Sequence, residues 1–162
     1  MAVTSDPDLR RDQPFARPPR ELVSSSSHLL KRLSWVLKDL FGAAFDATGL
    51  TGPHYAVLAL LEEEPRETQA MIADALGYDR SHLVGLLDEL EKRDLIERRR
   101  DPDDRRRHLV SLTPEGKRAL GRLRAIVKRV EDEFFAPLDA EQRRTLYDLL
   151  SRLAAHHEPD RS

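Results

Sequence analysis

The sequence predicts a mainly α-helical protein with one small β-hairpin, and three observations support this prediction. Apolar residues recur at three- and four-residue steps over most of the chain, which is the spacing of a buried helix face. Charged residues make up 35% of the 162 residues, well above the usual quarter, which suits helices with long solvated faces. Two short β-compatible runs flank the turn-forming segment Asp101-Pro102-Asp103-Asp104, so we expect them to pair.

The composition excludes several classes of protein. The chain has no Cys, so it has no disulfides and no thiolate metal site. No apolar run approaches the roughly 18 residues that cross a bilayer, and residues 1–20 lack the apolar core of a secretory signal. We therefore expect a soluble, cytoplasmic protein of one domain with extensions, and no membrane partner.

The first 48 residues divide into an arm and a long helix. Residues 1–19 contain four prolines and little apolar content, so we expect a disordered or loosely docked arm. Residues 20–48 carry leucines and aromatics at helical spacing, and no proline interrupts this stretch before Pro53. A helix over 21–47 would be about 40 Å long. Because a compact domain of this size does not require such length, we assign this region to dimerisation.

Residues 50–113 are predicted to form one unit of three helices and a hairpin. Thr51 is a typical N-cap for a helix over 55–61, and Thr68 caps a second helix over 69–76 that ends at Gly77. A third helix, capped by Asp79 or Ser81, runs to about residue 92. Strands over 95–99 and 108–112 form the hairpin, which carries arginines on both sides of its turn.

Two further helices are predicted over 114–157. Thr113-Pro114-Glu115 is a helix start, with a capping hydroxyl, a proline at the first position and an acid at the positive end of the dipole. Pro137 ends that helix, and Asp139 with Gln142 forms a capping-box start for the last one. Both helices carry apolar residues at helical spacing, and we assign residues 114–157 to the dimerisation region as well.

Residues 69–92 have the spacing of a helix-turn-helix. Two helices that cross steeply need a small residue where their backbones approach and a residue free to take positive φ in the turn. Ala73 and Gly77 supply these, and the aliphatic Leu83 follows six positions later. A generic helical hairpin is the alternative, but the arginine-rich hairpin over 95–112 favours a winged helix-turn-helix that binds double-stranded DNA.

The two DNA-contacting parts follow from this geometry. The second helix would enter the major groove, and the hairpin would lie along the backbone as a wing with an arginine in the adjacent minor groove. The alternative for the hairpin is a solvated charged surface. The predicted major-groove residues are Arg80, Ser81, His82 and Gly85. The predicted wing residues are the arginines Arg98, Arg99, Arg105, Arg106 and Arg107, and the family resemblance given below adds Asp104.

The stretches 79–98 and 101–116 resemble the MarR (multiple antibiotic resistance regulator) family. The most specific piece is Asp-x-Arg, matched by Asp104 and Arg106, followed by an apolar strand and Leu-Thr-x-x-Gly. The resemblance extends less specifically from about residue 22 to residue 155. It implies a winged helix-turn-helix transcriptional regulator in which Asp104 braces the wing and Arg106 reaches the minor groove.

Two positions depart from the family pattern. Asp94 stands where the family usually has glycine, so we expect the turn into the wing to be strained or differently capped. Tyr78 replaces a more common small aliphatic residue, which is expected to change packing and to leave the mode of DNA binding as it is.

The resemblance also implies an obligate homodimer. A winged core of about 65 residues cannot cover the apolar stripes of residues 20–48 and 114–157, so we expect them to pack against a second copy around a twofold axis; packing within one chain is the alternative. The predicted interface residues are Leu29, Leu149 and Leu153. A twofold dimer predicts a pseudo-palindromic operator with half-sites roughly 34 Å apart.

A small-molecule site is expected from the family alone. Its members bind small aromatic acids and phenols between the dimerisation helices and the winged helix, so a similar effector is expected here, and no cofactor. The candidate contacts are His28, Trp35, His54 and Tyr55. The alternatives are structural, with Trp35 in a core and His54 at a helix start.

The charge distribution agrees with a DNA-binding function. The formal net charge is −2, but residues 92–129 carry 14 Lys and Arg against six Asp and Glu, which leaves +8 there and −10 elsewhere. No phosphate loop, nucleophile elbow or metal-ligand spacing indicates an enzyme or a metal site. We therefore predict a ligand-responsive homodimeric repressor; an architectural nucleoid protein of low sequence specificity is the alternative.

Overall fold

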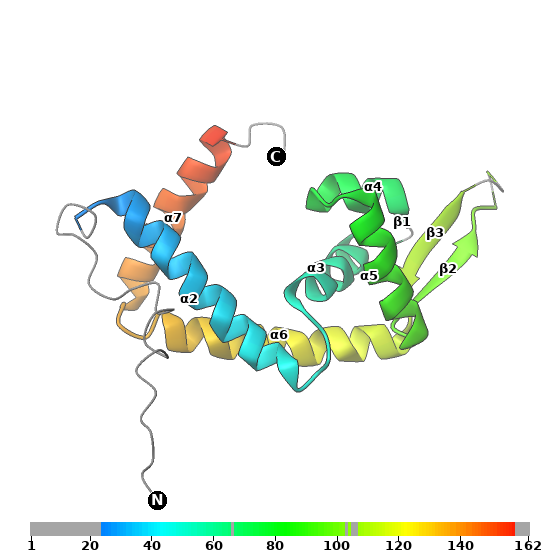
Figure 1. Cartoon of the computed structure of the whole chain (residues 1–162), viewed down its shortest axis with the longest axis horizontal. Helices are drawn as coiled ribbons and strands as arrows, with labels where there is room; N and C mark the ends of the chain where they lie inside the picture. The colour runs from blue at the N-terminus through cyan, green and yellow to red at the C-terminus, as the bar shows by residue number, and fades with distance from the viewer. Residues whose placement is uncertain (1–23, 66, 103, 105–106, 158–162) are drawn as a thin grey trace, which may run out of the picture. The chain divides into compact units, whose positions relative to one another are not determined.

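The computed structural model describes residues 24–65, 67–102, 104 and 107–157. It is mainly helical with a small antiparallel sheet, which confirms the predicted fold class. The elements are α2 (Ser26–Asp46), α3 (Gly52–Glu63), β1 (Glu67–Thr68), α4 (Gln69–Leu76), α5 (Arg80–Lys92), β2 (Ile96–Arg100), β3 (His108–Leu112), α6 (Pro114–Phe134) and α7 (Ala140–His157) (Figure 1). The arm predicted for residues 1–19 lies outside the described residues.

The chain forms two compact units, Met1–Lys38 and Asp39–Ser162. Helix α2 begins in the first unit at Ser26, five residues later than predicted, and its last turns belong to the second. The second unit contains every other described helix and strand.

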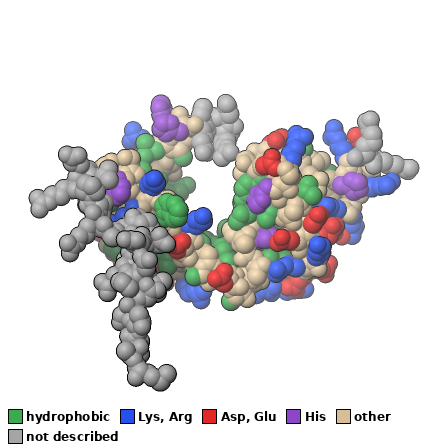
Figure 2. Space-filling model, viewed as in Figure 1, with side chains coloured by type: hydrophobic (Ala, Val, Ile, Leu, Met, Phe, Trp, Pro, Cys, Tyr) green, Lys and Arg blue, Asp and Glu red, His purple; other side chains and the backbone are tan. Residues whose placement is uncertain are grey.

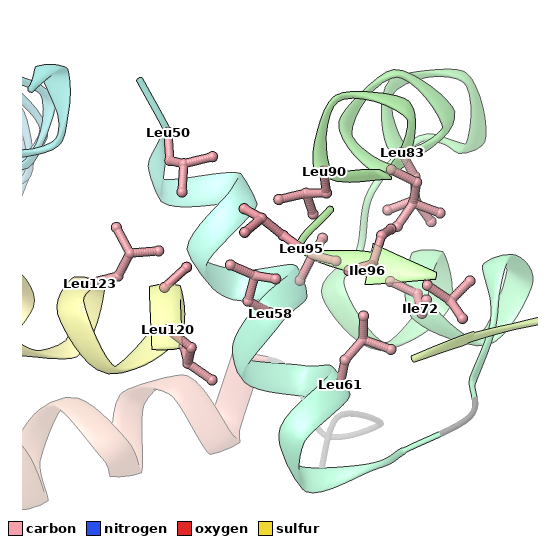
Figure 3. Packing of buried hydrophobic residues seen from close by; sticks show 14 of the residues in the cluster. Leu50, Leu58, Leu61, Ile72, Leu83, Leu90, Leu95, Ile96, Leu120 and Leu123 are labelled. Carbon is pink, nitrogen blue, oxygen red and sulfur yellow. The ribbon is translucent and has the colours of Figure 1, made fainter. Parts of the chain in front are cut away.

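Among the described residues, an apolar cluster joins the sheet to the helices from α3 to α6. Helices α3, α4, α5 and α6 and the sheet each contribute side chains to it, as Figure 3 shows. Its largest fully buried members are Leu58, Leu61, Ile72, Leu83, Leu87, Leu90, Ile96, Leu120 and Leu123, with Val57 and Val110. Burying each such side chain contributes about 1.5–3 kcal/mol. Leu120 and Leu123 of α6 are among them, so this part of the stripe that was assigned to dimerisation packs within one chain.

The sheet is antiparallel, with strand order β1-β3-β2. Strands β2 and β3 pair as the predicted hairpin, with Ile96 opposite Leu112 and Arg98 opposite Val110. The sequence did not predict β1, in which Glu67 pairs with Val110. This two-residue strand joins the start of α4 to the outer edge of the hairpin.

The helix-turn-helix forms as the capping residues predicted. The Thr68 hydroxyl accepts from the amide of Met71 at 3.3 Å to begin α4, and Gly77 ends it in the left-handed region at φ 64°. Helix α3 begins at Gly52, three residues before the predicted start. There the imidazole of His54 caps the helix, since its Nδ1 accepts from the amide of Thr51 at 3.1 Å.

The end of α5, the start of β2 and the start of α6 meet in one tight junction. Asp94 has φ 56°, so the predicted strain is present: the chain takes the left-handed turn for which glycine is usual. The Thr113 hydroxyl donates to the carbonyl of Asp94 at 2.6 Å and accepts from the amide of Gly116 at 2.9 Å. Its own amide donates to the carbonyl of Leu95 at 3.1 Å.

Candidate nucleic-acid interface

The N-terminal end of α5 is exposed and firmly capped. One carboxylate oxygen of Asp79 accepts from the amides of Ser81 at 2.9 Å and His82 at 3.3 Å, and from the Ser81 hydroxyl. These hydrogen bonds, led by the one from the hydroxyl, hold the pKa of Asp79 below its usual value. Asp79 is therefore the N-cap, as one of the two predicted alternatives had it, and Ser81 lies inside the helix.

The four residues predicted to enter the major groove share this exposed end of α5. Arg80, Ser81, His82 and Gly85 are all exposed, while Leu83 between them is buried. A Cβ added at Gly85 would meet nothing within 4 Å. The face opposite the core is thus open and carries one guanidinium, one hydroxyl and one imidazole.

Tyr78 lies beside this face. Its ring meets that of His82 edge-on, with ring centroids 5.7 Å apart and planes at 74°. Partial burial against the apolar cluster raises the pKa of Tyr78. Tyr78 therefore packs against the core and contacts one imidazole on the exposed face of α5.

Backbone hydrogen bonds close the described part of the turn between β2 and β3. The amide of Asp101 donates to the carbonyl of Arg107 at 3.0 Å, and the amide of Arg107 donates to the carbonyl of Asp104 at 2.9 Å. The Asp104 carboxylate lies 3.4 Å from Nε of Arg107. These contacts place Asp104 where it can brace the wing. Arg105 and Arg106 lie outside the described residues.

The arginines of β2 do not all face solvent. The side chain of Arg99 is 76% exposed and pairs with Glu97 at 2.8 Å, whereas the side chain of Arg98 is only 20% exposed. Arg98 contacts the carboxylates of Asp88 and Glu91 on α5. Charge alone grouped Arg98 with the exposed arginines of the wing, and the structure separates it from them.

Four basic residues of α6 pair with carboxylates close by. Arg118 and Arg122 both bind Glu115, whose pKa they lower, Arg122 first and then Arg118. Arg124 binds Glu62 of α3, and Lys128 lies 2.6 Å from Asp132. Much of the positive charge of residues 92–129 is therefore paired with nearby carboxylates, both in the wing and along α6. Figure 2 shows acidic and basic side chains intermixed over α5 and β2 and basic ones near the far end of the wing.

A cleft of about 610 Å³ lies between the loop before α3, the junction after α5 and the flank of α6. Its lining includes the apolar Leu50, Leu95, Leu123 and Ile126 and the two arginines Arg93 and Arg122. The cleft thus combines an apolar lining with two arginines, of which Arg122 pairs with Glu115.

None of the predicted effector contacts lines this cleft. His54 is 3% exposed, caps α3 and lies 3.1 Å from a carboxylate oxygen of Glu89. Tyr55 packs against the apolar cluster, with its ring centroid 6.3 Å from that of Phe45. Trp35 is 48% exposed and so is no core residue, and His28 is half-buried. The sequence did not indicate that Arg93 and Arg122 line one cleft, because nothing in their spacing joins residues 29 positions apart.

The described residues offer no sign of two other kinds of site. They contain no group of three or more His, Cys, Asp or Glu side chains that could hold a metal ion. None of the helices formed by them combines the length and the apolar character needed to cross a membrane.

Comparisons with known proteins identify the family. A model of the MarR family matches residues 48–107. A putative transcriptional regulatory protein for the hcr operon of Thauera aromatica is 38% identical over 105 residues, 65% of this chain; the match spans 63% of that protein, less than two thirds of it. The transcriptional regulator HosA of Escherichia coli is 32% identical over 104 residues, which cover 64% of this chain and 77% of HosA. The chain belongs to the MarR family.

The solved structures agree with this assignment. The transcriptional repressor CouR, bound to a 23-mer DNA duplex, superposes on this MarR-family chain with a TM-score of 0.78 and 34% identity, over 85% of this chain and 98% of CouR. CouR from Rhodococcus jostii RHA1 is also known bound to p-coumaroyl-CoA. The protein is thus a MarR-family, DNA-binding transcriptional regulator, in agreement with the prediction from the sequence.

Proposed function

We propose that this MarR-family protein is a ligand-responsive homodimeric repressor of a pseudo-palindromic operator. The observation that carries the proposal is the likeness to CouR in its DNA-bound form, at a TM-score of 0.78, together with an exposed and capped N-terminal end of α5. In this proposal the exposed end of α5 enters the major groove, and the wing lies along the adjacent backbone.

Each part of the interface has a distinct role. Arg80, Ser81, His82 and Gly85 contact base edges, and a guanidinium is well suited to the acceptors of guanine. Arg99 and Arg107, with Arg105 and Arg106, supply charge to the wing, and Arg106 enters the minor groove. Asp104 does not contact DNA in this scheme; it holds the wing closed through Arg107.

The dimer uses apolar surface that one chain leaves uncovered. Helix α7 has no buried residue over its 18 positions, and Leu149 and Leu153 are 52% and 51% exposed. Leu29 on α2 is 43% exposed. Such surfaces are costly in water unless a partner covers them, and a second copy around a twofold axis would do so.

The effector of this proposal is a small aromatic acid or phenol bound in the cleft beside Arg93 and Arg122. The cleft borders the junction between α5 and β2, so a bound molecule would press on the segment that joins the two DNA-contacting elements. CouR, a relative of similar fold, is known with an aromatic thioester bound. In this proposal effector binding weakens operator binding.

A footprint on the DNA upstream of the protein's own gene tests the proposal. We expect protection of two half-sites about one helical turn apart, and light scattering that gives twice the chain mass of 18.6 kDa. Salicylate and p-coumarate serve as probe effectors, and titration with at least one of them should abolish the protection of the operator. Equal affinity for random duplexes would instead indicate an architectural protein, and a folded monomer would contradict the dimer.

A further inference from the structure

Arg98 faces the protein interior because of its place in β2. Side chains alternate along a strand, so Arg98 shares the face of Ile96, which is buried in the core, while Glu97 and Arg99 share the other face. Strand β2 packs its inner face against α5. A long side chain on that face reaches the helix and not the solvent.

The guanidinium of Arg98 meets two carboxylates on one side of α5. Its Nη2 contacts Oδ1 of Asp88, and its Nε lies 3.5 Å from Oε2 of Glu91. Asp88 and Glu91 are three residues apart, so they project from the same side of the helix. The side chain of Arg98 is 20% exposed, so water screens this contact less than it screens the ion pairs of the outer wing.

We propose that Arg98 is a positioning residue that fixes the wing relative to α5. The planar guanidinium offers donors in a rigid fork, and its two carboxylate partners define both the distance and the direction between β2 and the helix. The backbone joins the two elements only through the Arg93–Asp94–Leu95 junction, at the base of the wing. Arg98 adds a second attachment closer to the tip.

This attachment matters for specific binding more than for non-specific binding. Specific binding requires that α5 and the wing engage adjacent grooves at the same time, whereas non-specific binding depends mainly on phosphate neutralisation. A loosened wing would still carry its exposed arginines. It would no longer be held in the orientation in which both elements fit one site.

The experiment compares two arginines that are neighbours in β2. A duplex selected by the wild-type protein from a random-sequence pool serves as the specific probe, and a scrambled duplex of the same length as the non-specific one. We expect Arg98→Met to lower affinity for the selected duplex at least tenfold, with less than a threefold change for the scrambled duplex. The slope of log K against log salt should stay unchanged. Arg99→Met, the matched control, should weaken binding to both duplexes and reduce the slope by about 0.9 for each phosphate that is no longer neutralised.

Two further variants separate positioning from charge and from folding. Arg98→Met combined with Asp88→Asn restores the net charge, so it should retain the loss of specificity, and the two changes should be non-additive in a double-mutant cycle. Arg98→Lys keeps the positive charge but not the forked guanidinium, so we expect an intermediate loss of affinity for the selected duplex. If circular dichroism shows that Arg98→Met is unfolded, Arg98→Lys takes its place in the comparison. Wing amides should exchange hydrogen faster in Arg98→Met than in Arg99→Met.

The proposal is overturned if Arg98→Met reduces the salt slope as Arg99→Met does, because Arg98 would then contact a phosphate directly. It is also overturned if the folded Arg98 variants bind the selected duplex as the wild type does. Failure of the wild-type protein to select any duplex would instead contradict sequence-specific binding itself.

Discussion

The backbone of Gly116 at the start of α6 lies against the carbonyl of Leu95 at the start of the wing. A Cβ at position 116 would stand 1.9 Å from that carbonyl oxygen and 2.9 Å from its carbon. No real Cβ tolerates such a contact, and the obstructing atoms are backbone, which no rotamer change can move. The glycine of the Leu-Thr-x-x-Gly motif therefore lies where the backbones of α6 and the wing approach too closely for any side chain.

Gly116→Ala should destabilise the fold by about 3 kcal/mol or more, because either α6 or the strand must shift. Gly121→Ala is the matched control, since it lies in the same helix and a Cβ added there would meet nothing within 4 Å. That substitution should stabilise the protein by about 0.5–1 kcal/mol. Urea unfolding followed by circular dichroism measures both, and equal effects would contradict the close approach.

The hydroxyl of Thr113 should account for much of the stability of the same junction. Thr113→Val keeps the shape but removes the donor to Asp94 and the acceptor for Gly116, so we expect a loss of about 1–3 kcal/mol. Thr113→Ser retains the hydroxyl and should lose less than half as much. If the valine and serine variants unfold at the same urea concentration, the hydrogen bonds contribute little.

The buried imidazole of His54 should make stability depend on pH. Burial lowers its pKa below the ordinary value of 6.5; nearby Arg93 and His82 act in the same direction, and Glu89 opposes them. Protonation would also place a hydrogen on Nδ1, which accepts from the amide of Thr51. The unfolded chain thus takes up the proton at higher pH than the folded chain does. The free energy of unfolding should therefore fall as the pH is lowered through 6.5, until the folded-state pKa is passed.

His54→Gln is the comparison for this pH dependence. It removes the titrating group, so the difference between the wild-type and variant unfolding free energies should shrink as the pH falls from about 7.5 to 5.5. Thermal or urea unfolding at each pH gives the two profiles. Parallel profiles over that range would exclude His54 as the source.

Arg80→Ala should weaken binding to the operator by about 1–3 kcal/mol and relax the base preference at one position of each half-site. Arg129→Ala is the control, since it removes the same charge from an exposed site on α6 well beyond the wing. Gel-shift titrations with singly substituted duplexes, at one salt concentration, measure both variants. An equal loss for all duplexes would assign Arg80 to the phosphate backbone.

Local chemistry predicted most of the fold. The bounds of α4 follow from Thr68 and Gly77, a cap and a left-handed stop that act within one turn of the chain. The strain at Asp94 was expected because the family usually has glycine there, and φ is 56°. Strand β1 could not be predicted in this way: two residues carry no periodicity, and Glu67 finds its partner 43 positions away.

The sequence predicted which elements form the candidate site, but not which carboxylates its arginines contact. Strand alternation from Ile96 would have indicated that Arg98 faces inward, but grouping the arginines by charge concealed it. Arg118 and Arg122 pair with Glu115, which lies three and seven positions earlier in the same helix. Arg124 pairs with Glu62 on α3, and this pair is visible only in the folded chain. Nothing local to the sequence joins Arg93 and Arg122 into one cleft.

Gly85 gives this protein room for new binding preferences. It lies on the exposed face of α5, and a Cβ added there would meet nothing within 4 Å. Replacing a helical glycine with almost any residue also favours the helix. A single substitution at this position could therefore add a contact to DNA while the fold keeps or gains stability. After gene duplication, a copy could acquire a different operator without first passing through a weakened protein.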